Sequence, residues 1–296
     1  MIENLQREVR ALKAKILDGK AIAAEVKKEL RTAADRAAAR GARPRLAVVL
    51  AGADPASLTY AQAKKKQAES VGMEMELFHL AAAVSEKEVT ALIRRLNADA
   101  RAHGVMVELP LPAGINARTV AAAIEPDKDV DGVHPINRGR LMNGEPGLYP
   151  ATPQSCIALL KRSGVPLAGR HAVIIGRGDT VGKPLVFLLL RENATVTVCH
   201  SQTPELSRLT RQADILVAAA GRAGLVTREM VQPGAAVVDA GLSQTEDGMR
   251  GDVDFAGVSE TAGWISPSPG GVGALTTALL FANVLQAMEK NTFKNR

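Results

Sequence analysis

Apolar and polar positions in the first half of the chain alternate between a strand-like period and a helix-like period. Three short apolar runs predict strands, at residues 45–50, 75–80 and 105–109. Between them, residues 57–70 and 85–97 have helical periodicity, and Ser85 with Glu88 forms a capping-box pattern. Strands that alternate with helices of this length predict a parallel sheet with helices on both faces.

The alternation restarts after a stretch rich in Gly, Pro and Asn, which we expect to be a loop from residue 135 to Pro153. Five further apolar runs predict strands, at residues 171–175, 195–199, 214–220, 235–240 and 264–267. Helical patterns cover residues 184–191 and about 275–290. The chain is therefore predicted to form two α/β domains, residues 1–150 and 151–274.

The first forty residues have a helical pattern from Glu3 to about Arg40, with Gly19 as a break between two helices. The N-terminus is charged throughout and lacks the apolar core of a signal peptide. No apolar run approaches the roughly 18–20 residues that a membrane span needs. Cys156 and Cys199 lie far apart without metal-ligand spacing, which favours buried thiols in a reducing compartment. We predict a cytoplasmic protein with no metal site and no membrane partner.

Composition and charge narrow the class of partner. The 296 residues are 46% hydrophobic and 23% charged, as in a soluble globular protein, and only 3% are aromatic. The net charge of +6 comes from basic residues spread along the chain, with few aromatic rings to stack on bases. We therefore expect an anionic small ligand, and no nucleic acid.

A glycine-rich loop follows the strand predicted at 171–175 and leads into a helix. Gly176, Gly178 and Gly182 form G-x-G-x-x-x-G, one residue longer than the usual dinucleotide fingerprint. Backbone amides at the start of such a helix bind pyrophosphate, which predicts a Rossmann-type second domain.

The next strand indicates which dinucleotide is bound. An NAD-specific fold places an acidic residue about 20 residues beyond the first glycine, but here the strand ends C-H-S-Q-T. Arg177, His200 and Ser201 instead complement a 2′-phosphate. We predict NADP over NAD.

Two further features carry candidate chemistry in the first domain. Tyr60 and Lys64 lie four residues apart, hence on one helical face. Tyr-x-x-x-Lys is typical of short-chain dehydrogenases, where this motif follows the glycine loop. Here the motif precedes the glycine loop, so the chain is not predicted to be a short-chain dehydrogenase. Glu108 ends an apolar strand, where a buried carboxylate is costly unless it has a partner.

Taken together, these and other stretches resemble the bifunctional methylenetetrahydrofolate dehydrogenase/methenyltetrahydrofolate cyclohydrolase family. The matching stretches run in one order from about residue 14 to the end of the chain. They are I-L-D-G-K-A-I-A (16–23), Y-A-Q-A-K-K-K (60–66), L-P-L-P (109–112), P-D-K-D-V-D-G-V-H (126–134), T-P (152–153), I-G-R-G-D-T-V-G-K-P (175–184), N-A-T-V-T-V-C-H-S-Q-T (193–203), G-D-V-D-F (251–255) and S-P-S-P-G-G-V-G (266–273).

The resemblance implies a fold and a set of roles. It implies a cleft between two α/β domains, with folate on the first domain and NADP on the second, and a last helix (275–296) that packs back on the first. Lys64 matches the catalytic lysine, Tyr60 the tyrosine that stacks on the folate, and Asp131 the aspartate that anchors the pterin. Asp127 and Asp129 are expected to have structural turn roles. Other substrate-binding positions are Leu109, Pro110, Pro269, Gly270 and Gly271. The cofactor positions are Gly176, Arg177, Gly178, Thr180, Val181, Gly182, His200 and Ser201. Family members are usually homodimers that pair through the cofactor domain.

Four positions depart from the family pattern. The family commonly has Gln at Glu108, Gly at Ser155, Ser at Gly178 and Pro at Ala274. Glu108 is expected to face Lys64 and to favour its ammonium form, which makes Glu108 a candidate base. The alternative for Glu108 is that it points to solvent or to a nearby Arg.

Three functions follow from these residues. The first is the bifunctional enzyme, which oxidises 5,10-methylenetetrahydrofolate and hydrolyses the methenyl product. The second is a dehydrogenase whose cyclohydrolase step is weak or lost through Glu108. The third is a non-catalytic NADP- or folate-binding regulator, against which Tyr60, Lys64 and Asp131 argue.

Overall fold

A computed structural model describes residues 14–52, 54–246 and 248–294, and the part of the first predicted helix within residues 1–13 lies outside them. The chain divides into two compact units. The catalytic-side unit comprises residues 24–151 and the chain from residue 277. The glycine-loop unit comprises the chain up to residue 23 and residues 152–276.

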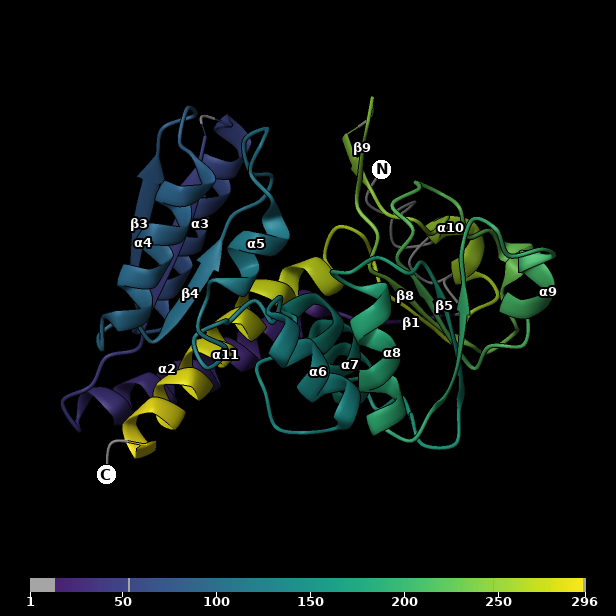
Figure 1. The fold of residues 1–296 in the computed structure, drawn as a ribbon. Coiled ribbons are helices and arrows are strands. Elements are labelled where there is room, and N and C mark those ends of the chain that lie inside the picture. Colours follow the sequence, from purple (N-terminus) through teal and green to yellow (C-terminus); the bar gives the residue numbers. More distant parts are fainter. Residues whose placement is uncertain (1–13, 53, 247, 295–296) are drawn as a thin grey trace, which may run out of the picture. The chain divides into compact units, whose positions relative to one another are not determined.

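The catalytic-side unit contains a three-stranded parallel sheet, in the order β3-β2-β4 (Figure 1). Its strands are β2 (Arg45–Ala51), β3 (Glu74–Leu80) and β4 (Gly104–Val107). The connections are α3 (Pro55–Ser70) and α4 (Glu86–Ala98), and the predicted capping box of Ser85 and Glu88 is present. Because β2 is central and covered on both faces, it reads as one apolar run, and Val48 and Val49 are fully buried.

The glycine-loop unit contains a six-stranded parallel sheet, in the order β1-β11-β8-β7-β5-β6. Its strands are β1 (Lys15–Ile16), β5 (His171–Ile175), β6 (Thr195–Cys199), β7 (Ile215–Ala218), β8 (Ala236–Asp239) and β11 (Trp264–Ile265). The chain passes from β5 to β6 on one side and then returns to β7 on the other. Such a reversal of direction creates a crevice at the carboxyl ends of the strands, where α/β proteins bind nucleotides.

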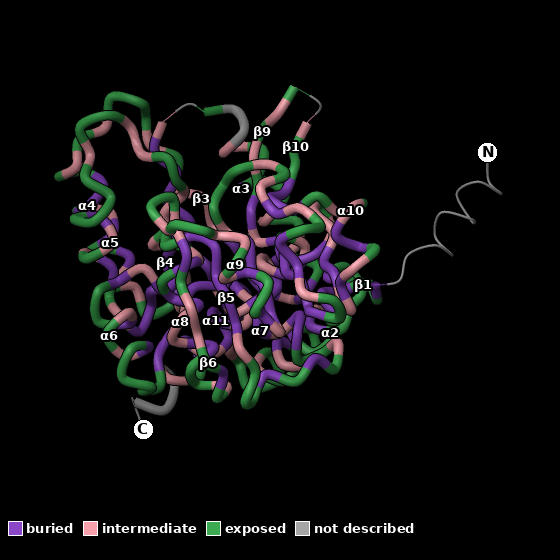
Figure 2. Tube along the Cα trace, turned by 90° about the vertical axis from the view of Figure 1, so that its right-hand side faces the viewer, coloured by how far each residue is buried: buried purple, intermediate pink, exposed green. Residues whose placement is uncertain are grey.

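Helices cover both sheets. They are α2 (Gly19–Ala38), α5 (Ala117–Ala122), α6 (Pro135–Asn143), α7 (Ala151–Arg162), α8 (Gly182–Arg191), α9 (Leu206–Thr210), α10 (Phe255–Ser259) and α11 (Val272–Lys294), with a 3₁₀ turn η1 (Arg228–Met230). A short antiparallel hairpin consists of β9 (Ser243–Thr245) and β10 (Gly248–Arg250). Buried positions concentrate in strands such as β5 and along α7 (Figure 2).

Three predicted elements differ in the structure. Residues 15–16 are not helical but pair with β11, so residues 14–23 belong to the glycine-loop unit and not to the first predicted domain. Gly19 does not separate two helices but opens α2, where a Cβ would lie 1.9 Å from the carbonyl oxygen of Gly271. Residues 135–143 form α6 instead of a loop, with His134 as N-cap and Pro135 in the first turn.

The C-terminal helix α11 is both long and apolar. From residue 277 it groups with the catalytic-side unit, where the Asn283 amide donates hydrogen bonds to the carbonyls of Val130 (2.7 Å) and Tyr149 (2.8 Å). Contrary to the expectation that no apolar run approaches that length, its Val272–Lys290 segment is long and apolar enough to cross a membrane by length and composition alone. More than half of that segment is buried inside the protein, which is typical of the core helix of a soluble protein.

Candidate functional site

A lysine and a carboxylate form an ion pair at the carboxyl end of the three-stranded sheet. The Lys64 ammonium, on α3, pairs with the Glu108 carboxylate, which follows β4 directly. Lys64 Nζ also lies 3.5 Å from Met106 Sδ. The side chains of Lys64 and Glu108 are only 14% and 15% exposed. The predicted pairing is therefore present, and the alternative that Glu108 points to solvent or to an Arg is wrong.

Local structure explains this placement. The Glu108 amide donates to the Val49 carbonyl at 2.9 Å, which extends the β2–β4 ladder by one residue and fixes the backbone of the carboxylate. Asp54 caps α3 by accepting hydrogen bonds from the amide and the hydroxyl of Ser57. The capped helix α3 thus positions Lys64, and the end of the β2–β4 ladder positions Glu108.

Exposed apolar side chains accompany the pair. Tyr60, one helical turn before Lys64, is 64% exposed, and Leu109, the residue after Glu108, is 55% exposed. The Leu109–Pro110 peptide is cis. Large exposed apolar groups beside a polar centre are characteristic of a ligand-binding surface.

Asp131 is electrostatically coupled to this pair. The pKa of its half-buried carboxyl group is raised to about 6, mainly by desolvation, with the charges of Asp129 and Glu108 also raising it and that of Lys64 lowering it. The turn that carries Asp131 includes Gly132 (φ +66°), where a Cβ would lie 2.4 Å from the Pro150 nitrogen.

The neighbouring aspartates hold the turn, as expected. Asp129 is fully buried and accepts hydrogen bonds from the amides of Val133 (3.2 Å) and His134 (2.9 Å), and from the Asn137 side chain (2.9 Å). Asp127 forms an ion pair with Arg140 at 3.1 Å.

A separate cleft lies in the glycine-loop unit, at the carboxyl ends of β5, β7, β8 and β11. Its volume is about 670 Å³, a size typical of small-molecule and cofactor sites. Seven of the predicted site residues line it: Gly178, Thr180, Val181, Gly182, Pro269, Gly270 and Gly271.

The glycine loop is closely packed at two of its three glycines. Gly176 has φ +122°, and a Cβ there would lie 2.1 Å from the Ala219 carbonyl oxygen. A Cβ on Gly182 would lie 2.3 Å from the Gly176 oxygen, so the loop folds tightly against the start of α8. A Cβ on Gly178 would meet nothing within 4 Å. Gly176 and Gly182 are therefore sterically required, and Gly178 is not.

The other predicted cofactor residues lie at the ends of β5 and β6 and outside the cleft lining. The side chains of Arg177 and Ser201 are exposed, and His200 is half-buried. His200 Nδ1 accepts a hydrogen bond from the Gln202 amide at 3.2 Å, so Nε2 carries the proton of the neutral ring. That proton makes Nε2 a donor for an anionic group.

The remaining lining residues were not predicted as site residues, and among them are Lys20, Thr152, Asp239 and Leu242. Asp239 accepts hydrogen bonds from the amides of Gly241, Asp252 and Val253, while its burial raises its pKa to about 6. The stretch G-D-V-D-F marks part of this network in the sequence. Lys20 reaches the cleft because Gly19 packs on the 267–273 loop, a contact that spacing along the chain does not reveal.

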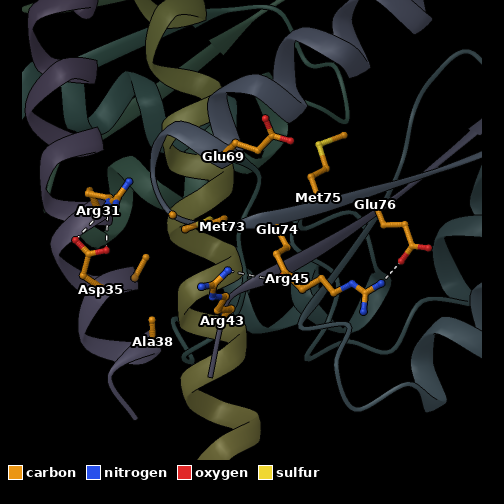
Figure 3. A pocket seen from close by; sticks show the side chains of 12 residues that line it. Arg31, Asp35, Ala38, Arg43, Arg45, Glu69, Met73, Glu74, Met75 and Glu76 are labelled. Atoms are coloured by element: carbon orange, nitrogen blue, oxygen red, sulfur yellow. Dashed lines mark hydrogen bonds and ion pairs between the residues drawn. The ribbon is translucent and has the colours of Figure 1, made fainter. Parts of the chain in front are cut away.

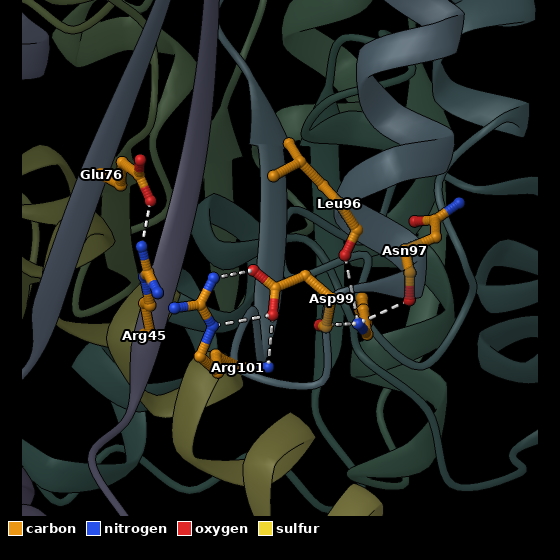
Figure 4. Close-up of polar contacts among 7 residues, drawn as sticks. Arg45, Glu76, Leu96, Asn97, Asp99 and Arg101 are labelled. Carbon is orange, nitrogen blue, oxygen red and sulfur yellow. Dashed lines mark hydrogen bonds and ion pairs between the residues drawn. The ribbon is translucent and has the colours of Figure 1, made fainter.

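Two other polar regions of the catalytic-side unit are built from contacts within the protein. A hollow of about 520 Å³ is lined by ion pairs of Arg31 with Asp35, Arg43 with Glu74 and Arg45 with Glu76 (Figure 3). The Lys128 ammonium donates to the carbonyls of Leu96, Asn97 and Asp99 at the end of α4 (Figure 4). These contacts stabilise the fold and give no indication of a ligand. Among the described residues, no group of three or more His, Cys, Asp or Glu side chains could hold a metal ion.

The two units define an α/β protein with a Rossmann-type nucleotide-binding unit and a second unit that presents a lysine–carboxylate pair. Residues 17–131 match the family described as "Tetrahydrofolate dehydrogenase/cyclohydrolase, catalytic domain", and residues 150–292 match its "NAD(P)-binding domain". The chain belongs to the tetrahydrofolate dehydrogenase/cyclohydrolase family, as the sequence resemblance predicted.

Individual relatives cover nearly the whole chain. "Bifunctional protein FolD 2" of Desulfitobacterium hafniense (strain Y51) is 57% identical over 275 residues, which are 93% of this chain and 97% of that protein. "Bifunctional protein FolD" of Heliobacterium modesticaldum is 59% identical over 273 residues, 92% of this chain and 95% of that protein.

Solved structures of the same family are also similar to this chain over nearly its whole length. The bifunctional enzyme FolD from Campylobacter jejuni superposes with a TM-score of 0.92 at 42% identity and covers 94% of this chain and 99% of its own. The Trypanosoma brucei enzyme, solved with NADP and an inhibitor, has a TM-score of 0.88 at 36% identity and covers 94% of this chain and 98% of its own.

Proposed function

We propose that the chain is a bifunctional enzyme of one-carbon metabolism. It oxidises 5,10-methylenetetrahydrofolate with NADP⁺ to the 5,10-methenyl compound and hydrolyses that product to 10-formyltetrahydrofolate. The observation that carries the proposal is the Lys64–Glu108 ion pair, coupled to Asp131, in a chain that also contains a dinucleotide-type cleft. Membership of the family and the near full-length bifunctional relatives support both steps.

The folate would bind to the catalytic-side unit. The exposed ring of Tyr60 provides a stacking surface, and Leu109 with the cis Pro110 provides an apolar edge. The Asp131 carboxylate can accept two N–H hydrogen bonds from the amino-pyrimidine edge of a pterin. In the cleft of the glycine-loop unit, Pro269, Gly270 and Gly271 let backbone approach a ligand closely.

The glycine-loop unit has the features needed to hold NADP. At Gly176 and Gly182 the loop is so tight that a side chain would collide with neighbouring backbone. The backbone amides at the start of α8 can donate hydrogen bonds to a pyrophosphate. Arg177, His200 Nε2 and Ser201 supply a cation and donors for the 2′-phosphate, while Gly178, Thr180 and Val181 border the cleft. When bound, NADP⁺ supplies the acceptor for the hydride.

The ion pair assigns roles for the hydrolytic step. As the cation of this pair, Lys64 acts as a proton donor and as an electrostatic group. Glu108 Oε1 is then the base that accepts a proton from the attacking water. Asp131 orients the folate and stays ionised above its pKa of about 6.

A substitution of Lys64 tests these roles. Lys64→Met should abolish hydrolysis of 5,10-methenyltetrahydrofolate, a loss of at least about 100-fold as expected for a positioned proton-transfer group. The measurement follows the decay of methenyl absorbance. Full hydrolysis by this variant would contradict the assignment.

A second substitution tests the departure from the family. Glu108→Gln should restore the pH profile of hydrolysis typical of the family, and an unchanged profile would mean that Glu108 does not take part in hydrolysis.

An assay of the wild-type protein with 5,10-methylenetetrahydrofolate and either NADP⁺ or NAD⁺ distinguishes the bifunctional enzyme from the two alternative functions. Reduced cofactor with accumulating methenyl compound indicates a dehydrogenase that lacks the second step, and neither signal indicates a regulator.

We further propose that the protein is a cytoplasmic homodimer whose product supplies formyl groups for purine biosynthesis. Support for the dimer comes from β6, the edge strand of the six-stranded sheet, where Val198 is exposed, and from Leu190, exposed on the adjacent α8.

A further inference from the structure

Glu108 changes the charge of the folate site. With all three groups ionised, Lys64 contributes one positive charge and Glu108 and Asp131 contribute two negative charges. A glutamine at position 108 would leave these groups neutral in sum. Because the Glu108 side chain is only 15% exposed, solvent screens its charge less than it screens a surface carboxylate.

The ligands of the proposed reaction differ in charge at the reacting carbon. The 5,10-methenyl compound is a cation, whereas the 5,10-methylene and formyl compounds are neutral there. The remaining charges of the folate are common to all of them and cancel in a comparison.

From these two observations we propose that Glu108 makes the folate site selective for the cationic methenyl form over neutral one-carbon forms. The inference rests on the proposed function and deepens it. The site holds the intermediate that links the two reactions more tightly than it holds its substrate or its product. A site of this kind limits escape of the intermediate before hydrolysis.

The geometry separates this role from a purely structural one. In Glu108→Gln the side chain keeps its length, and the amide oxygen can still accept the hydrogen bond from Lys64 Nζ. The backbone hydrogen bond from the residue 108 amide to the Val49 carbonyl does not depend on the side chain. The substitution therefore removes the charge and the proposed base but keeps these hydrogen bonds, and a binding measurement made before turnover reports the charge alone.

The experiment measures dissociation constants of 5,10-methenyltetrahydrofolate and of neutral 5-formyltetrahydrofolate by rapid mixing, before turnover. In Glu108→Gln we expect methenyl binding to weaken about ten-fold, while binding of the 5-formyl compound changes less than two-fold. Glu69→Gln is the matched control, because it removes one negative charge from the exposed end of the same helix α3. It should leave the ratio of the two constants unchanged.

The outcomes are distinct. Equal changes for both ligands, or no change for either, would overturn the inference even if the wild-type enzyme reduces NADP⁺. Binding of both folates without NADP⁺ reduction would overturn the proposed function, while the ratio of constants would still decide the selectivity. Failure of the wild-type protein to bind either folate would overturn both.

Discussion

Three ionisable side chains share one electrostatic environment at the proposed folate site. Asp131 responds to both members of the ion pair, because Glu108 raises its pKa and Lys64 lowers it. A carboxylate that must be ionised to bind a pterin loses that ability as the pH falls through its pKa. The kcat/KM of the dehydrogenase step should therefore fall below about pH 6, and Asp131→Asn should remove this pH dependence.

The coupling predicts shifts of opposite sign. Glu108→Gln removes a negative neighbour, so the pKa of Asp131 and the acid limb of the kcat/KM profile should move to lower pH. Lys64→Met removes a positive neighbour and should move the same limb to higher pH. Profiles of the dehydrogenase step in the three proteins measure both shifts. Shifts of the same sign would mean that another group controls the limb.

The same carboxyl group links pH to stability. Its pKa is raised from 3.8 unfolded to about 6 folded, so the folded state binds more protons between these values. The free energy of unfolding therefore decreases as pH rises from about 4 to about 6. Asp131→Asn should raise it by about 1 kcal/mol at pH 7.5, after discounting for partial exposure, and by nothing at pH 4. Urea unfolding followed by circular dichroism at both pH values measures the difference. An equal gain at pH 4 would point to packing and not to charge.

At the scale of elements, the β5–α8 turn depends on two of its glycines. Gly176→Ala places a Cβ 2.1 Å from the Ala219 oxygen at a φ of +122°, which should destabilise the fold by at least about 2 kcal/mol and impair cofactor binding. Gly178→Ala is the matched control, because its Cβ meets no neighbour and it should unfold like the wild type. Thermal unfolding and NADP titration measure both effects. Equal losses in both variants would contradict the steric argument.

The same turn predicts a gain of function. Gly178→Ser has room for its side chain, and its hydroxyl adds one donor to the phosphate-binding loop. One net hydrogen bond of about 0.5–1.5 kcal/mol corresponds to NADP binding about 3- to 10-fold tighter. Calorimetric titration with NADP measures the gain. Unchanged or weaker binding would show that residue 178 does not face the phosphate.

Elements with their own periodicity were predictable from the sequence, and elements fixed by distant partners were not. The apolar runs of β2 and β5 and the capping box of α4 are local signals, and each is present. The two-residue β1 exists because β11, far along the chain, offers it an edge. The polar helix α6 has only Asn137 and Leu141 buried, so its sequence has no apolar stripe to predict it.

The residues of the candidate site also divide into those that the sequence predicted and those that it did not. Local patterns predicted Lys64 on a helix face and Glu108 at a strand end, and the family resemblance predicted that the two side chains pair. Asp239 and Lys20 were missed because the cleft that they line forms only when loops from four strands and the start of α2 come together. Family resemblance supplied roles that spacing alone does not give, such as that of Asp131.

At the scale of the whole molecule, the proposed homodimer depends on the free edge of the six-stranded sheet. Within the described part of the chain β6 pairs only with β5, and Val198 on this strand is 37% exposed. An edge strand with an exposed β-branched residue can pair with the same strand of a second copy around a two-fold axis. Such pairing would continue the sheet through both subunits.

A charge on that edge should separate the subunits. Val198→Lys should convert a dimer of twice 31.1 kDa into a monomer of 31.1 kDa, because a lysine blocks edge-to-edge pairing. Met249→Lys is the matched control, since Met249 is 39% exposed on β10 and should leave the dimer intact. Light scattering coupled to gel filtration measures the masses, and NADP titration shows whether each variant retains its cofactor site. A Val198→Lys protein that stays dimeric, or a monomeric wild type, would place any subunit contact elsewhere or exclude it.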